Sequence, residues 1–168
     1  IYFYDPEDEY QIRLEVNSLK DRLKRPSSYQ DVLVIDIFEL LLSYLSDKKF
    51  GKKMFLDYLL EKEGDMPEKV NTTLKQEAKS EKFFELVNSH IQTHISEPGE
   101  SKKSLVFLHG IGKIFPYLRA SKFISNFEKY IGGYKLVIFY PGKDRGHLSL
   151  FDKLVDEHSY RSTKLINN

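Results

Sequence analysis

The stretch that decides the fold is residues 104–113, SLVFLHGIGK, in which an apolar run leads into two glycines and a lysine. A short apolar run bounded by turn-forming residues is typical of a strand buried on both faces. Residues 104–108 therefore predict a strand and residues 109–113 a glycine-bearing turn. A helix is predicted to follow from about Pro116, with its apolar stripe ending at Ile131. A strand that turns directly into a helix is the repeating unit of parallel α/β sheets.

The same alternation extends along the chain in both directions. The predicted strands are at 1–4, 32–37, 134–140 and 162–166, and the predicted helices are at 6–25, 38–45, 52–63, 66–95 and 116–131, with a short helix or turn at 148–157. We therefore expect one α/β domain over residues 1–168. It should be a three-layer sandwich with a mainly parallel central sheet of about five strands, Rossmann-like or similar to a degenerate P-loop fold. Because the chain begins with Ile1, directly in a strand-like run, we expect an N-terminal segment to be missing.

Composition excludes several classes of protein. The chain has no Cys, which excludes disulfide frameworks, thiolate metal sites and cysteine nucleophiles. Its apolar runs are far shorter than the ~20 residues that span a bilayer, so we expect a cytoplasmic protein without membrane contact. Residues 1–100 carry a net charge of −6 and residues 101–168 a net charge of +7. The basic part either attracts phosphate-bearing or acidic partners, or mixes with the acidic part over the folded surface.

The glycine-bearing turn suggests a binding site for an anion. Gly110 and Gly112 would let the backbone approach a phosphate closely, and Lys113 would supply positive charge. The motif is incomplete, because a Walker A loop has another glycine where Phe107 stands and Ser or Thr where Ile114 stands. Two interpretations therefore remain open: the glycines allow tight packing of the turn, or they form an anion or nucleotide site.

No other pattern predicts catalysis. His90 and His94 have the four-residue spacing of two metal ligands on a helix, but no third ligand accompanies them. The carboxylates within residues 5–9 are explained by capping of the helix that follows. No nucleophile elbow, kinase signature or deaminase signature is present. We therefore predict a protein with no catalytic residues, no metal and no cofactor.

Basic, aromatic and proline residues follow the strands at 104–108 and 134–140. If these two strands are parallel, their loops meet at one edge of the sheet, and the residues there form a candidate partner surface. Its members are Pro116, Tyr117, Arg119, Tyr140, Pro141, Lys143 and Arg145. Such a patch suits nucleic acid or an acidic protein surface, although a solvated loop with no function would have the same composition.

Several segments together resemble one protein family. They are IYFYDPEDE at 1–9, IGKIFPYLRAS at 111–121, FYPG at 139–142, LSLF at 148–151 and Tyr-Arg at 160–161. This pattern resembles the BrxB family, small proteins encoded in bacterial BREX (bacteriophage exclusion) defence clusters. The resemblance covers nearly the whole chain. The loop KDRGH at 143–147 departs from the family pattern, which places a partner contact through this loop in doubt.

The resemblance implies a non-enzymatic component of a multi-protein defence system. The implied partners are other BREX proteins, the PglZ-type protein first among them, with indirect contact to DNA as a further possibility. The leading hypothesis is a protein-binding adaptor that uses the carboxyl edge of the sheet. The alternative hypothesis is a nucleotide- or nucleic-acid-binding domain that uses Gly110, Gly112 and Lys113 together with the basic loops.

Overall fold

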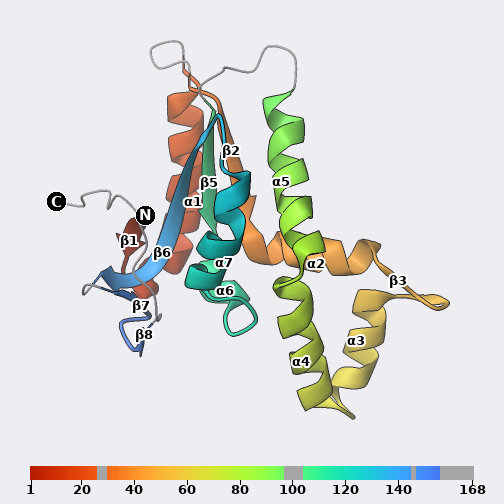
Figure 1. Ribbon diagram of the computed structural model, residues 1–168. Coiled ribbons are helices and arrows are strands. Elements are labelled where there is room, and N and C mark those ends of the chain that lie inside the picture. Colours follow the sequence, from red (N-terminus) through yellow and green to blue (C-terminus); the bar gives the residue numbers. More distant parts are fainter. Residues whose placement is uncertain (26–29, 97–103, 145–146, 156–168) are drawn as a thin grey trace.

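The computed structural model describes residues 1–25, 30–96, 104–144 and 147–155 (Figure 1). Its centre is a sheet whose strands are β1 (Tyr2–Tyr4), β2 (Val32–Asp36), β5 (Leu105–His109), β6 (Lys135–Asp144), β7 (Leu148–Leu150) and β8 (Leu154–Val155). β5 lies between β2 and β6 and runs parallel to both, and β1 runs parallel to the later part of β6. β7 is antiparallel to the end of β6, and β8 is antiparallel to β7.

The α/β class is confirmed, whereas a mainly parallel sheet and a Rossmann-like arrangement are not, because the sheet is mixed. The difference arises at 148–155, where the sequence predicted a short helix or turn and the structure has two short strands. Phe151 and Asp152, in the turn between these strands, have φ of 54° and 59°. Such left-handed backbone is common in the tight turns that join antiparallel strands. The strand predicted at 162–166 lies outside the described residues.

Helices pack on both faces of the sheet. The first face is covered by η1 (Pro6–Asp8) and α1 (Glu9–Leu23), whose Ile12 and Val16 are buried against Val32, Phe107 and Phe139. The other face carries α2 (Ile37–Asp47), α5 (Glu81–Ile95), α6 (Ile111–Ile114), α7 (Ala120–Phe127) and η2 (Glu128–Tyr130). This second face holds the larger part of the buried core.

The chain segment that connects β2 to β5 forms a helical extension that leads away from the sheet (Figure 1). It consists of α2, the hairpin of β3 (Lys49–Phe50) and β4 (Lys53–Met54), α3 (Phe55–Glu63) and α4 (Pro67–Ala78). The single helix predicted at 66–95 is two helices, α4 and α5. Ser80 begins the second of them, because its hydroxyl accepts a hydrogen bond from the Phe83 N–H at 3.2 Å.

Across the described part of the chain, none of the helices combines the length and the apolar character that a bilayer crossing demands.

Candidate functional site

The carboxyl ends of three parallel strands bring polar side chains together at one edge of the sheet. β1 ends at Tyr4, β2 at Asp36 and β5 at His109. In open α/β sheets this edge is where ligands bind, because the loops that leave it are free to vary while the strands stay fixed. The glycine-bearing segment at 109–113 leaves the same edge, because it follows the carboxyl end of β5.

The carboxylate of Asp36 is the centre of this edge. One of its oxygens, Oδ1, accepts hydrogen bonds from the backbone N–H groups of Phe38 at 3.1 Å and Glu39 at 3.3 Å, which caps α2. Its other oxygen, Oδ2, forms an ion pair with the ammonium group of Lys113, which also contacts the Glu39 carboxylate at 3.3 Å. Only 13% of the Asp36 side chain and 22% of the Lys113 side chain are exposed. The candidate phosphate-binding lysine is therefore already held by two carboxylates.

Both glycines of the turn lie where a side chain would collide with a neighbour. Gly110 has φ of +84°, and a Cβ there would be 2.5 Å from Asp36 Oδ1. A Cβ at Gly112 would be 3.1 Å from the ring of Phe151 and 3.1 Å from Pro141 Cγ. The space above the turn thus holds an anionic side chain and an aromatic ring. A phosphate at the turn would compete with Asp36 for the ammonium group of Lys113.

Two further ionisable groups are buried beside Asp36. The imidazole of His109 is 8% exposed, and its Nδ1 lies 3.5 Å from Asp36 Oδ2. Burial lowers the pKa of His109, with the charges of Lys113 and Arg13 acting in the same direction and Asp36 and Glu9 opposing them. The Tyr4 hydroxyl donates a hydrogen bond to Glu9, and burial followed by this bond raises the pKa of Tyr4. Sequence reasoning did not single out His109 or Tyr4, although Tyr4 ends a predicted strand and His109 is the first residue of the predicted glycine-bearing turn.

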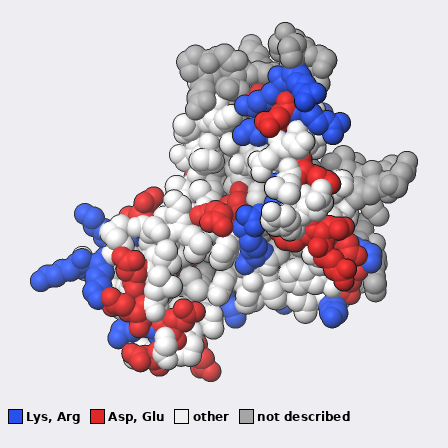
Figure 2. Space-filling view, turned by 180° about the vertical axis from the view of Figure 1, so that it is seen from behind, with Lys and Arg blue, Asp and Glu red and all other residues white. Residues whose placement is uncertain are grey.

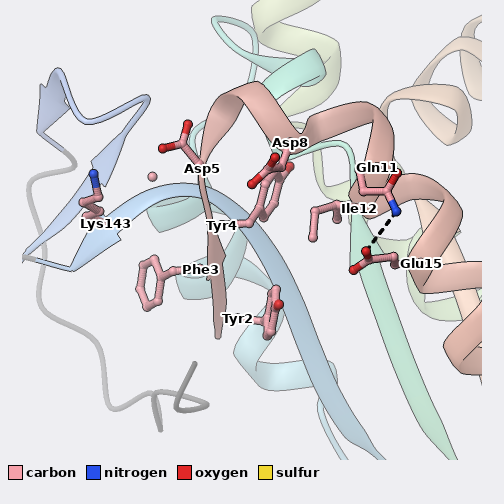
Figure 3. Close-up of a pocket in the computed structure, with 10 residues that line it drawn as sticks. Tyr2, Phe3, Tyr4, Asp5, Asp8, Gln11, Ile12, Glu15 and Lys143 are labelled. Atoms are coloured by element: carbon pink, nitrogen blue, oxygen red, sulfur yellow. Dashed lines mark hydrogen bonds between the residues drawn. The ribbon is translucent and has the colours of Figure 1, made fainter. Parts of the chain in front are cut away.

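A pocket of about 490 Å³ opens next to this cluster, between β1, the start of α1 and the hairpin of β6 and β7 (Figure 3). Asp5 and Asp8 line it from the start of the helix, and Lys143 lines it from the hairpin. Glu15, which accepts a hydrogen bond from Gln11 at 3.0 Å, lies farther along α1. Among the described residues, no group of three His, Cys, Asp or Glu side chains is placed to hold a metal ion. The pocket's polar groups can accept or donate hydrogen bonds and can pair with charged groups of a partner.

The predicted partner surface is partly exposed and partly buried. Pro116 and Arg119 are exposed and Tyr117 is half-buried, all in or beside the loop between α6 and α7. Tyr140 and Pro141 are buried, so the prediction that they belong to an exposed patch is wrong. The physical reason is that β1 pairs with this part of β6, and the Phe3 ring packs edge-on against the Tyr140 ring at 5.6 Å between centroids. The remaining candidate, Arg145, lies outside the described residues.

Aromatic and ionic contacts join the two exposed loops into one surface. The ring of Phe115 packs edge-on against that of Phe151, with the centroids 6.2 Å apart. The next residue, Asp152, pairs with the exposed ammonium group of Lys143 at 2.5 Å. We define the loop surface as Pro116, Tyr117, Arg119 and Lys143. It borders the pocket of Figure 3, because Lys143 belongs to both.

The ion pair between Asp36 and Lys113 should make a large contribution to stability. We expect D36N to lower the free energy of unfolding by about 1–3 kcal/mol, because Asn keeps the cap but leaves Lys113 with less compensation. The single variant K113M should also lose stability, because it leaves Asp36 without its partner. The double variant D36N/K113M should lose less free energy of unfolding than D36N and K113M lose in sum.

Denaturant unfolding of wild type, D36N, K113M and D36N/K113M measures the coupling between Asp36 and Lys113. The control is K53M, which breaks the pair of Lys53 with Glu61, whose side chains are 54% and 53% exposed. Its effect should be within about 0.5 kcal/mol. Strictly additive effects of D36N and K113M would contradict the coupling.

Burial of His109 should make stability depend on pH. Its pKa is lower in the folded protein than in the unfolded chain, so the unfolded chain takes up a proton first as the pH falls. The free energy of unfolding should therefore decrease as the pH is lowered through about 6.5, and H109Q should remove this part of the dependence. Urea unfolding at a series of pH values tests this, with H90Q at an exposed position as the control that keeps the wild-type slope. If the free energy of unfolding of wild type and of H109Q changes with pH in the same way, burial of His109 is not the cause of the pH dependence.

Comparison with known proteins agrees with the resemblance. The family model for BREX protein BrxB matches residues 33–165. A protein named BREX protein BrxB from Bacillus cereus (strain H3081.97) is 29% identical over 168 residues, which cover 99% of this chain and 82% of the relative. No solved structure gives a significant match. Since the family model spans most of the sequence, from within β2 to beyond β8, the chain belongs to the BrxB family.

Proposed function

We propose that this protein is a non-enzymatic adaptor of a BREX system that binds another protein of the system through the carboxyl edge of its sheet. Membership of the BrxB family makes it a component of a BREX phage-defence system. The adaptor role goes further and rests on the chemistry of the edge. The observation that carries it is the pairing of Lys113 with Asp36 and Glu39 above the glycine turn.

This pairing argues against nucleotide binding at the turn. A phosphate-binding loop needs free backbone N–H groups and an available cation. Here the ammonium group of Lys113 is bound to the Asp36 carboxylate and also contacts Glu39, so the cation of the motif is not available to a phosphate. A phosphate at the turn would also bring its negative charge close to Asp36, in a site shielded from water. The edge therefore favours protein contact over phosphate binding.

The same edge also argues against catalysis. A catalytic site needs a nucleophile or base within reach of a substrate. Tyr4 is bound to Glu9, and Asp36 is bound to Lys113. His109 is buried beside this pair rather than exposed in the pocket. These ionisable groups stabilise the edge, and the absence of an activity is part of the proposal.

The loop surface offers the side chains that commonly dominate protein interfaces. Arg and Tyr are enriched among residues whose truncation costs more than about 2 kcal/mol of binding energy. Arg119 is exposed at the start of α7 and Tyr117 precedes it in the same loop. The neighbouring pocket could receive a side chain of the partner between Asp5, Asp8 and Lys143. We propose the PglZ-type protein of the system as the partner, as the family resemblance implies.

Co-purification tests the proposal directly. The tagged chain, expressed with the other BREX proteins, should retain the PglZ-type protein at low salt. R119A should weaken the complex about 30-fold, which corresponds to about 2 kcal/mol. The matched control is K135A, because Lys135 is an exposed cation at the opposite end of β6.

Two results would count against it. A wild-type chain that retains no BREX protein would contradict the adaptor role. Equal retention by wild type, R119A and K135A, with unchanged melting temperatures, would contradict the loop surface as the place of binding.

A further inference from the structure

A groove of about 500 Å³ runs along one side of α1, on the face of the sheet that this helix covers. Its floor is formed by strands and its wall by the helix. The residues that line it are Tyr2, Phe107, Val137 and Phe139 from the sheet, and Ile12, Glu15, Val16, Ser18, Leu19 and Arg22 from α1. The groove follows from the unequal covering of the sheet, since this face carries only η1 and α1 among the described helices, while the other face carries most of them.

The floor of the groove is largely aromatic. The Phe139 ring packs against Phe107 at 5.5 Å and against Tyr2 at 5.3 Å between centroids. On the helix, Leu14 is 52% exposed and lies one turn before Ser18, at the outer margin of the wall. An exposed leucine beside an apolar groove favours an occupant that covers both. The occupant therefore needs an exposed apolar side chain, and Leu14 of another copy is one.

The charged side chains along the wall of the groove determine which charges the occupant must carry. Glu15 and Arg22 are seven residues apart, so they lie on the same side of α1 with about 10.5 Å of helix between them. Asp8, which lines the neighbouring pocket, extends the negative end beyond Glu15. Figure 2 shows the same polarity on this side of the molecule, with basic side chains around the C-terminal end of α1 and acidic ones around its N-terminal end. A complementary occupant is basic next to Glu15 and acidic next to Arg22.

We propose that the occupant is α1 of a second copy of this chain, lying antiparallel in a two-fold symmetric dimer. A two-fold axis near Ser18 places Glu15 of each copy opposite Arg22 of the other, so one contact forms two identical ion pairs. This self-complementarity is what a symmetric interface requires. The small side chain of Ser18 allows the helix backbones to approach closely where they cross. The groove shares Tyr2, Ile12 and Glu15 with the pocket of Figure 3 but none of the four residues of the loop surface, so the dimer is tested separately from the adaptor role.

Charge reversal tests the dimer. Sedimentation velocity of the full chain should show a monomer–dimer equilibrium that shifts toward monomer in high salt, because the ion pairs are screened. E15R and R22E should each raise the dimer dissociation constant at least about tenfold, since each places like charges opposite one another twice. The double variant E15R/R22E restores opposite charges at both positions and should bring the dimer back.

The control is R13E, which reverses an exposed charge on the side of α1 opposite Glu15, outside the lining of the groove, and should leave the dimer intact. Wild-type protein that stays monomeric up to about 1 mM, where even a weak dimer with a free energy of association of about −4 kcal/mol would be well populated, would overturn the proposal. So would a double variant that dimerises no better than the single ones, since that result would show that Glu15 and Arg22 do not face each other.

Discussion

The contact between the Asp36 carboxylate and the glycine turn is the constraint on which the carboxyl edge depends. It joins the end of β2 to a lysine 77 residues later in the chain and also caps α2. Glycine is required at position 110 for two reasons: its backbone is left-handed, and the Asp36 carboxylate lies where a side chain would be. One side chain thereby stabilises the start of α2 and neutralises the lysine that a phosphate-binding loop would need.

The packing around Gly112 also determines which side chains are exposed at this edge of the sheet. Gly112 allows Phe151 and Pro141 to pack onto α6, and the antiparallel strands β7 and β8 hold Phe151 in that place. The rings of Phe115 and Phe151 then connect the loop before α7 to the hairpin that carries Lys143. The features that make the sheet mixed are thus the ones that build the loop surface and one wall of the pocket in Figure 3.

The sequence predicts the features that depend on local pattern. The four parallel strands lie close to their predicted ranges because each is an apolar run that ends in polar or turn-forming residues. The break at Ser80 contains neither Gly nor Pro, so the sequence analysis predicted one helix through it. Nothing local marks the left-handed backbone of Phe151 and Asp152, and the pairing of β1 that buries Tyr140 is a contact between distant segments. Likewise, the glycine motif predicted a change of direction after β5, but neither the short helix α6 within the predicted turn nor the carboxylate of Asp36 beside Gly110.

Titration of the protein with ATP and Mg²⁺, followed by thermal unfolding, tests this account most directly. A ligand at about 100 times its dissociation constant adds about 2.7 kcal/mol to stability, which is a readily measured rise in melting temperature. Because Lys113 is already paired with Asp36, we predict that ATP and Mg²⁺ do not raise the melting temperature. A rise that depends on nucleotide concentration and disappears in K113M would contradict the account, since it would show that the turn opens and binds phosphate.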